Sequence, residues 1–215
     1  MAKIKQGILG GFSGKVAGVV GTSWKGRAVM KSRPLSVANP KTEAQVEQRG
    51  KFSKIAELAS KMLTTFVQPV ENPISGDISG YNKFVKDNKG AFDAEGKLVA
   101  ADFVCGGGKI VNLGSAQIHT DAAEEELRLN WSNSAETSAL RKTDKVYVGV
   151  FDANGNLLAV SSGTETRNNT SVNFDDLYDA GLVEAGMKVL MLFACVSADG
   201  RDVSVMTNAL EKTIS

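Results

Sequence analysis

Histidine and cysteine are scarce in this chain, and their scarcity excludes several kinds of active site. The 215 residues contain one histidine and two cysteines. A Ser–His–Asp triad would have to use His119, which stands beside Asp121 near the end of an expected strand. A zinc site needs about four ligands close together, and the two cysteines are far apart in the sequence. We therefore interpret His119 as a solvent-exposed edge residue, and we expect no enzyme activity, no cofactor and no bound metal.

The two cysteines provide no disulfide framework. Cys105 and Cys195 are separated by 90 positions and lie in apolar, strand-like segments. Small buried cysteines behave as hydrophobic residues, and free thiols persist in reducing compartments. We interpret both as buried free thiols, and a disulfide between them is the alternative that the spacing leaves open.

The usual targeting and phosphate-binding patterns are also missing. The early apolar run is broken by glycines and by Lys15, without a signal-peptide cleavage motif, so we expect synthesis in the cytoplasm and no membrane-spanning helix. Two glycine-rich segments include a lysine, at residues 10–16 and 106–110. Val16 and Ile110 stand where a P-loop has serine or threonine, so neither segment is predicted to bind a nucleotide. No small-molecule substrate is expected.

Acidic residues are absent from the first 34 positions, which contain seven lysines or arginines and seven glycines. Residues 1–60 carry eleven basic and three acidic side chains, a sum of +8, and the remainder carries 14 and 21, a sum of −7. This composition predicts an extended basic arm over residues 1–38 that acquires its shape on a partner. Within the arm we expect a β-ribbon: a strand from Val16 to Trp24, a turn at Lys25–Gly26 and a returning strand from Arg27 to Lys31.

The arm carries the residues that we predict to bind a partner. A lone two-stranded ribbon is only marginally stable in water, so it needs a surface to pair with. In the preferred interpretation the arm adds as a strand to a neighbouring copy, with Phe12 and Trp24 as apolar anchors. In the alternative, the cations neutralise nucleic-acid phosphates and Trp24 stacks on a base. The predicted partner-binding residues are Lys3, Lys5, Phe12, Lys15, Trp24, Lys25, Arg27, Lys31 and Arg33.

The segment after the arm has the periodicity of a helical hairpin. Asn39–Pro40 opens the first helix, Thr42 and Gln45 fit a capping box, and Pro69 ends the run. A second, shorter helix is expected from Ser79 to Asn88. The residues expected on the buried faces are Phe52, Ile55, Ala56, Ala59, Met62, Leu63 and Phe66 in the first helix, and Tyr81, Phe84 and Val85 in the second.

From Phe92 onward the apolar period changes to two, which predicts short antiparallel strands stacked as a β-sandwich. Hairpin turns are expected at Asn154–Gly155 and Asp199–Gly200, and a short helix or loop at Asp175–Leu182. The expected strands are Lys97–Val104, Lys109–His119, Glu126–Trp131, Lys145–Phe151, Leu157–Ser162, Ser171–Phe174, Met187–Val196 and Val203–Thr207.

These C-terminal strands resemble an immunoglobulin or fibronectin type III sandwich. The resemblance is carried by Leu127–Trp131 and Lys188–Val196, and it implies that Trp131 plugs the core. The cysteine pair of antibody domains is absent. The expected fold class is α+β, with an immunoglobulin-like antiparallel β-sandwich at the C-terminal end. The expected segments are the basic arm 1–38, a helical hairpin 39–90, a connecting hairpin and glycine linker 91–108, and the sandwich 109–215.

The N-terminal motifs resemble an uncharacterised family (a domain of unknown function) of proteins from Bacteroidota and their phages. That family implies no activity and no catalytic residue, and its phage association implies a particle component. The motifs that carry the resemblance are Lys5–Val16, Gly21–Gly26, Arg33–Pro34 and Asn39–Gln45, together with Arg49 and Phe52.

Three functional hypotheses follow. The preferred one is a structural assembly protein, such as a virion or large-particle component that oligomerises through its arm, with other copies and other particle proteins as partners. The alternative is a nucleic-acid-binding accessory protein, and the third is a cell-surface adhesion module. The acidic residues 121–126 and 175–176 lack the spacing of a calcium loop, so we interpret them as solvated charge. Residues 121–126 are also the candidate receiver for a neighbouring copy's arm.

Overall fold

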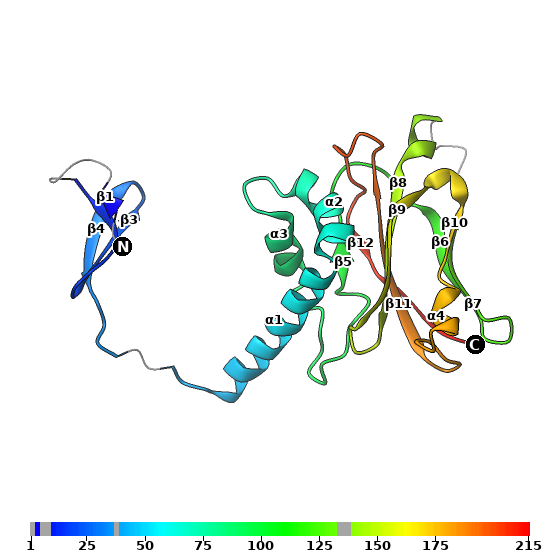
Figure 1. Ribbon diagram of the computed structural model, residues 1–215, viewed down its shortest axis with the longest axis horizontal. Coiled ribbons are helices and arrows are strands. Elements are labelled where there is room, and N and C mark those ends of the chain that lie inside the picture. The colour runs from blue at the N-terminus through cyan, green and yellow to red at the C-terminus, as the bar shows by residue number, and fades with distance from the viewer. Residues whose placement is uncertain (1–2, 5–9, 37–38, 133–138) are drawn as a thin grey trace. The chain divides into compact units, whose positions relative to one another are not determined.

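The computed structural model describes residues 3–4, 10–36, 39–132 and 139–215 (Figure 1). The chain divides into two compact units, Met1–Thr42 and Glu43–Ser215. The described residues of the first unit form strands and turns, and the second unit contains both helices and strands.

The first unit is an antiparallel sheet of four strands in the order β1-β2-β3-β4. The prediction of one strand over residues 16–24 is wrong, because a tight turn at Ala17–Gly18 divides it. The predicted turn at Lys25–Gly26 is confirmed. Its residues have φ values of 48° and 79°, the geometry of two-residue hairpin turns that follow the strand twist. The strands are β1 (Lys3–Ile4), β2 (Phe12–Val16), β3 (Val19–Trp24) and β4 (Arg27–Ser32).

The internal packing of this sheet is thin and centres on one glycine. Among residues 10–36 only Gly21 is buried. The Phe12 ring covers it, and a Cβ added to Gly21 would lie 2.5 Å from that ring, so no larger residue fits there. This segment therefore folds onto itself, whereas the sequence predicted an extended arm that takes its shape from a partner.

The second unit begins with helices that pack on one face of a sheet (Figure 1). The first long helix ends at Lys61, and one π-helical turn follows it. The prediction that Pro69 ends the helical run is wrong, because Pro69 stands in the first turn of the next helical segment, a position that tolerates proline. Ser79 Oγ accepts a hydrogen bond from the Asn82 amide (3.2 Å) and caps the second predicted helix. The helical elements are α1 (Glu43–Lys61), η1 (Leu63–Val67), α2 (Gln68–Glu71), η2 (Asn72–Ile74) and α3 (Gly80–Asp87).

The predicted buried faces of the helices are largely correct. Ile55, Met62 and Phe66 are fully buried, as is Phe84 in α3. The prediction for Phe52 is wrong: 54% of this residue is exposed, because the first half of α1 extends beyond the core that its second half covers.

The strands of the second unit form two larger antiparallel sheets, with orders β13-β11-β8-β9 and β10-β7-β6, and a small β12-β5 pair. The predicted strand Val203–Thr207 is reduced to the first residue of β12, and the sequence missed β13 altogether. The predicted short helix after β10 is α4 (Asp176–Asp179). The strands are β5 (Val104–Cys105), β6 (Gly114–Asp121), β7 (Glu126–Ser132), β8 (Lys145–Asp152), β9 (Leu157–Thr166), β10 (Ser171–Asn173), β11 (Lys188–Val196), β12 (Thr207–Asn208) and β13 (Leu210–Thr213).

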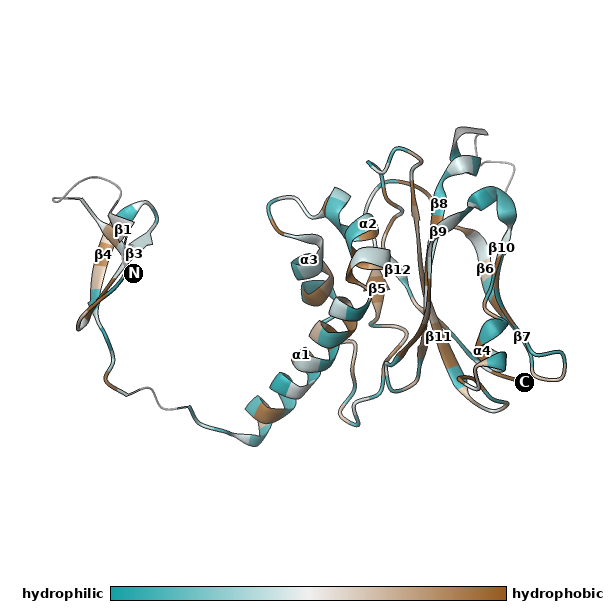
Figure 2. Cartoon of the chain, in the orientation of Figure 1, coloured by the Kyte–Doolittle hydropathy of each residue, from teal (hydrophilic) through white to brown (hydrophobic). Residues whose placement is uncertain are grey.

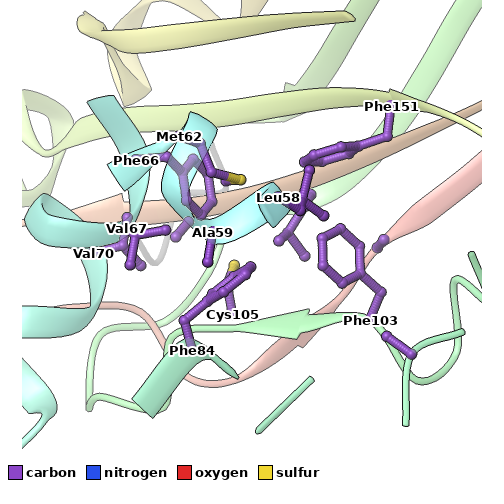
Figure 3. Packing of buried hydrophobic residues seen from close by; sticks show 14 of the residues in the cluster. Leu58, Ala59, Met62, Phe66, Val67, Val70, Phe84, Phe103, Cys105 and Phe151 are labelled. Atoms are coloured by element: carbon purple, nitrogen blue, oxygen red, sulfur yellow. The ribbon is translucent and has the colours of Figure 1, made fainter. Parts of the chain in front are cut away.

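The four-stranded sheet is the middle layer of the second unit, with a hydrophobic cluster on each face. Leu190 and Leu192 of β11 pack with the helices, and Met191 and Phe193 pack with the three-stranded sheet. Figure 2 shows β11 as a continuous hydrophobic strand, the composition expected of a strand covered on both faces. The helix-side cluster is built around aromatic rings (Figure 3).

The second cluster contains the tryptophan that the sequence placed in the core. Trp131 is buried between the two sheets, which confirms its predicted position. The presence of helices and of open antiparallel sheets confirms the α+β class.

Candidate interaction surface

The register of β2, β3 and β4 brings several predicted partner-binding residues to one face of the N-terminal sheet. Lys15 and Lys31 are both paired with Val20, and Trp24 is paired with Arg27. Directly paired residues of antiparallel strands point to the same side, and so do residues two apart along one strand. Lys15, Trp24, Arg27 and Lys31 therefore share one face, which we call the basic face.

Trp24 is the main apolar group of the basic face. It is 63% exposed, and the Nζ of Lys25 lies 5.1 Å from its ring centroid. This distance is that of a cation–π contact. An exposed tryptophan held by a rigid two-residue turn can bury its ring against a partner without losing much conformational freedom.

The opposite face of the same sheet is apolar. Val16 is paired with Val19, and Gly21 is paired with Met30. Met30 is 71% exposed and Val16 is 50% exposed. The sheet thus presents cations on one side and uncovered aliphatic side chains on the other.

The pairings of β2, β3 and β4 do not include the other five predicted partner-binding residues. Lys3 belongs to β1, opposite Ser13, and Lys5 lies outside the described residues. Phe12 packs on Gly21 inside its own unit. Lys25 occupies the β3–β4 turn, and the Arg33 amide donates a hydrogen bond to the Gly18 carbonyl (2.7 Å) just after β4. The structure therefore gathers four of the nine predicted residues on the basic face.

Charge separates the two units. Residues 1–42 contain eight lysines or arginines and no acidic residue, so no Lys/Arg side chain can form a salt bridge with an Asp or Glu of its own unit. Residues 43–215 contain the other 17 basic residues and all 24 acidic residues, which sum to −7. The two units therefore carry net charges of opposite sign.

The second unit contains a buried ionic cluster that sequence reasoning missed. Lys83 Nζ lies 2.8 Å from a carboxylate oxygen of Glu71 and of Asp87, and donates to the Gly106 carbonyl at 2.9 Å. The other oxygen of Glu71 accepts the Gly106 amide (3.0 Å). Burial raises the pKa of Glu71, and the hydrogen bond from Lys83 opposes that rise. The three ammonium hydrogens are all engaged, so the cluster ties α2 and α3 to the chain before β6.

A second polar cluster lies just before β8 and just after β9. Arg167 is buried, with its Nε 3.4 Å from an Asp144 oxygen, and its guanidinium donates to the Val111 and Asn112 carbonyls. Trp131 Nε1 donates to the Arg167 carbonyl at 2.9 Å. Burial raises the pKa of Asp144, and the neighbouring arginines oppose it. The one local sign of this cluster in the sequence is the i,i+3 spacing of Arg141 and Asp144, which form an ion pair.

The residues considered for catalysis are separated. Cys105 and Cys195 are free and buried, as predicted, and burial raises the pKa of Cys195 to about 12. His119 has a half-exposed side chain with Nε2 at 3.4 Å from Glu126, which confirms its exposed edge position. Within the described parts of the chain, no three His, Cys, Asp or Glu side chains come together as metal ligands. None of the helices described is both long and apolar enough to cross a membrane.

A family model matches residues 11–208, which is most of the chain. The chain therefore belongs to this family, described as a family of unknown function (DUF6266). No curated protein matches the sequence.

Proposed function

We propose that the chain is a structural assembly protein, in which the N-terminal sheet of one copy binds the second unit of another copy or of a related particle protein. The observation that carries the proposal is the distribution of charge and apolar surface. Every Asp/Glu side chain lies in the second unit, while the first unit combines eight cations with an exposed tryptophan and exposed aliphatic residues. A basic surface with an apolar anchor is suited to an acidic protein partner.

The particle that we propose is a virion, on the strength of the sequence resemblance to proteins of Bacteroidota and their phages. The protein would be made in the cytoplasm and would end up in that particle. Its partners would be other copies and neighbouring particle proteins, and no step of this role requires an enzymatic group.

We also propose that the sandwich is immunoglobulin-like. In chain order, β6, β7, β8, β9, β10, β11 and β13 would be strands A, B, C, C′, E, F and G. This assignment pairs B with A and E in one sheet, and F with C and G in the other, as the immunoglobulin fold does. Strand D, which pairs with E in that fold, has no counterpart among the described strands of this sheet.

The test is the molar mass of the full chain by light scattering after nuclease treatment, at low and high salt. We expect multimers at low salt that dissociate at high salt, because exposed charges are screened within about 10 Å at 0.1 M salt. A variant with Lys15→Glu, Arg27→Glu and Lys31→Glu should be monomeric. A control with Lys86→Glu, Lys89→Glu and Lys142→Glu changes the net charge equally and should still multimerise. A monomeric parent chain would contradict the proposal.

Nucleic-acid binding is the second candidate, favoured by the position of Trp24 beside lysine and on the same face as three further cations. Trp131 is buried, so quenching of tryptophan fluorescence by a single-stranded oligonucleotide would report on Trp24. Binding through three phosphate contacts should weaken with salt at a logarithmic slope of about −2. Trp24→Ala should remove about 1–3 kcal/mol of binding free energy. The absence of quenching at low salt would rule this candidate out.

A further inference from the structure

The two long sides of the sandwich differ. On one side the sheets are joined, because Lys212 of β13 donates to the Ile118 carbonyl of β6 at 3.1 Å, and the Ala122 amide donates to the Ser215 carbonyl at 2.9 Å. On the other side, β9 and β10 are the outermost strands of their sheets, and a groove of about 310 Å³ lies between them. We call this groove the open side.

The edge of β9 has few of the usual protections against pairing. Edge strands are normally short, charged, interrupted by proline, or bulged. β9 runs for ten residues, and its first six, Leu157–Ser162, include no charge and no proline. Its pairing with β8 is irregular between Leu157 and Ala159 and again after Ser162, and it is regular over the four residues between. These four residues of free strand edge are available to another strand.

The open side combines an apolar floor with an acidic rim. Val172, Phe174 and Leu177 are buried residues that line it, and Glu165 and Asp176 stand beside them. Glu165 accepts hydrogen bonds from the hydroxyls of Ser161 and Thr164, both at 2.7 Å. Burial acts to raise the pKa of Glu165, and these two hydrogen bonds outweigh it, so its pKa lies below the ordinary value. The rim is therefore negatively charged at neutral pH.

The N-terminal sheet offers a strand of sufficient length and opposite charge. β4 is the outer strand of that sheet, and all six of its residues are exposed. It carries Arg27 near one end and Lys31 near the other, with Ala28, Val29 and Met30 between them. Six residues of strand extend about 20 Å, which is long enough to pair along the whole regular edge of β9.

We propose that β4 of one copy adds to the free edge of β9 in a second copy, on the open side, with its cations at the acidic rim. This inference rests on the proposed assembly function and names the surfaces that carry it. Main-chain hydrogen bonds between the two edges provide the contact, and the charges select β4 over the other exposed strands. The added β4 becomes a fifth strand of the four-stranded sheet, next to β9. It lies beside the position in the other sheet where an immunoglobulin fold has strand D.

Cross-linking between copies tests the pairing directly. Met30→Cys and Ala159→Cys are prepared as separate full-length proteins, one of them isotopically labelled, and mixed with a bismaleimide whose spacer spans about 8 Å, the reach of diagonal cross-strand neighbours. The native thiols are buried with raised pKa values and should not react. We expect mixed covalent dimers, identified by mass. The control pairs Met30→Cys with Gln117→Cys on β6, an exposed position on the joined side, and should give at least tenfold fewer dimers.

Charge exchange gives an independent measurement. Asp176→Lys should weaken self-association about tenfold, as should Lys31→Asp, and combining both changes in one chain should restore it, since one lost charge contact is worth about this factor. Glu184→Lys, an exposed acidic residue away from the open side, is the matched control and should change little. Multimers that cross-link equally at both positions, or whose association responds equally to Asp176→Lys and Glu184→Lys, would overturn this inference and leave the assembly function standing. A chain that remains monomeric by light scattering would overturn both.

Discussion

The two units of this chain differ in how many buried hydrophobic and ionic contacts stabilise them. The second unit buries two hydrophobic clusters and pairs its buried carboxylates, such as Glu71, with cations such as the partly buried Lys83. Over residues 10–36 of the first unit only Gly21 is buried, and the charged side chains of this unit have no acidic partner within it. Isolated sheets with little core are marginal in water. The comparison indicates that the second unit is stabilised by its own hydrophobic contacts, whereas the described sheet of the first unit has little core of its own.

The largest effect is expected from a substitution in the core of the second unit. Phe103 is fully buried and makes edge-to-face contacts with Phe151 at 5.1 Å and Phe84 at 6.0 Å between ring centroids. Phe103→Ala should lower the free energy of unfolding by about 3–5 kcal/mol, because it removes apolar burial and leaves a cavity. This loss is measured by denaturant titration with circular dichroism as the readout. Met30→Ala, at an exposed site of the first unit, should stay within about 0.5 kcal/mol.

Removal of a buried charge should have the next largest effect. Glu71→Ala leaves Lys83 partly unpaired and the Gly106 amide without an acceptor, so we expect a loss of about 3 kcal/mol. Glu57→Ala removes the exposed ion pair with Lys61, whose N···O distance is a similar 2.9 Å, and should cost only about 0.3–0.5 kcal/mol. Equal losses measured by denaturant titration would mean that burial does not distinguish the two pairs.

Alkaline pH should destabilise the second unit through Cys195. Its pKa is about 12 in the folded chain, against an ordinary value of 9.0, so the thiol contributes stability that is present below pH 9.0 and lost as pH rises through about 12. Between these two pH values the free energy of unfolding should fall by about 1.4 kcal/mol per pH unit. Subtracting the pH profile of the Cys195→Ala variant isolates the contribution of Cys195, because the other groups that titrate in this pH range are common to both proteins. Identical pH profiles would contradict the assigned burial.

The smallest effects compare glycines in the two units. Gly26 has φ of +79° in the β3–β4 turn, so Gly26→Ala should destabilise the first unit by about 1 kcal/mol. Gly50 lies in α1 with open space around its Cβ position, so Gly50→Ala should stabilise the second unit by about 1 kcal/mol. Trp24 fluorescence reports on the first change and helical circular dichroism on the second. Shifts of the same sign would show that turn geometry does not limit the N-terminal sheet.

Local signals predicted most of the elements. Ser79 marked the start of α3, and the Lys25–Gly26 and Asn154–Gly155 pairs marked hairpin turns, because each of these features depends on a few adjacent residues. The turn at Ala17–Gly18 was missed because alanine at φ of 47° carries no turn signal. β13 was missed because its four residues are too few to establish an apolar period.

The candidate surfaces depended on contacts between distant residues, and were less accessible to sequence reasoning. Lys15 and Lys31 share a face because both pair with Val20, and that register depends on the missed turn. The groove between β9 and β10 depends on strand order, which composition does not specify. Only the difference in net charge between the two units could be predicted completely, because it follows from counting charged residues in the sequence.

The middle sheet of the second unit has a consequence for how the protein melts. β8 and β11 contribute side chains to both hydrophobic clusters, so neither the helical layer nor the three-stranded sheet can separate without exposing apolar groups of the same two strands. Residues 43–215 should therefore unfold as one cooperative block, with equal calorimetric and van't Hoff enthalpies. The N-terminal sheet shares none of those strands and is free to melt in a separate step at lower temperature.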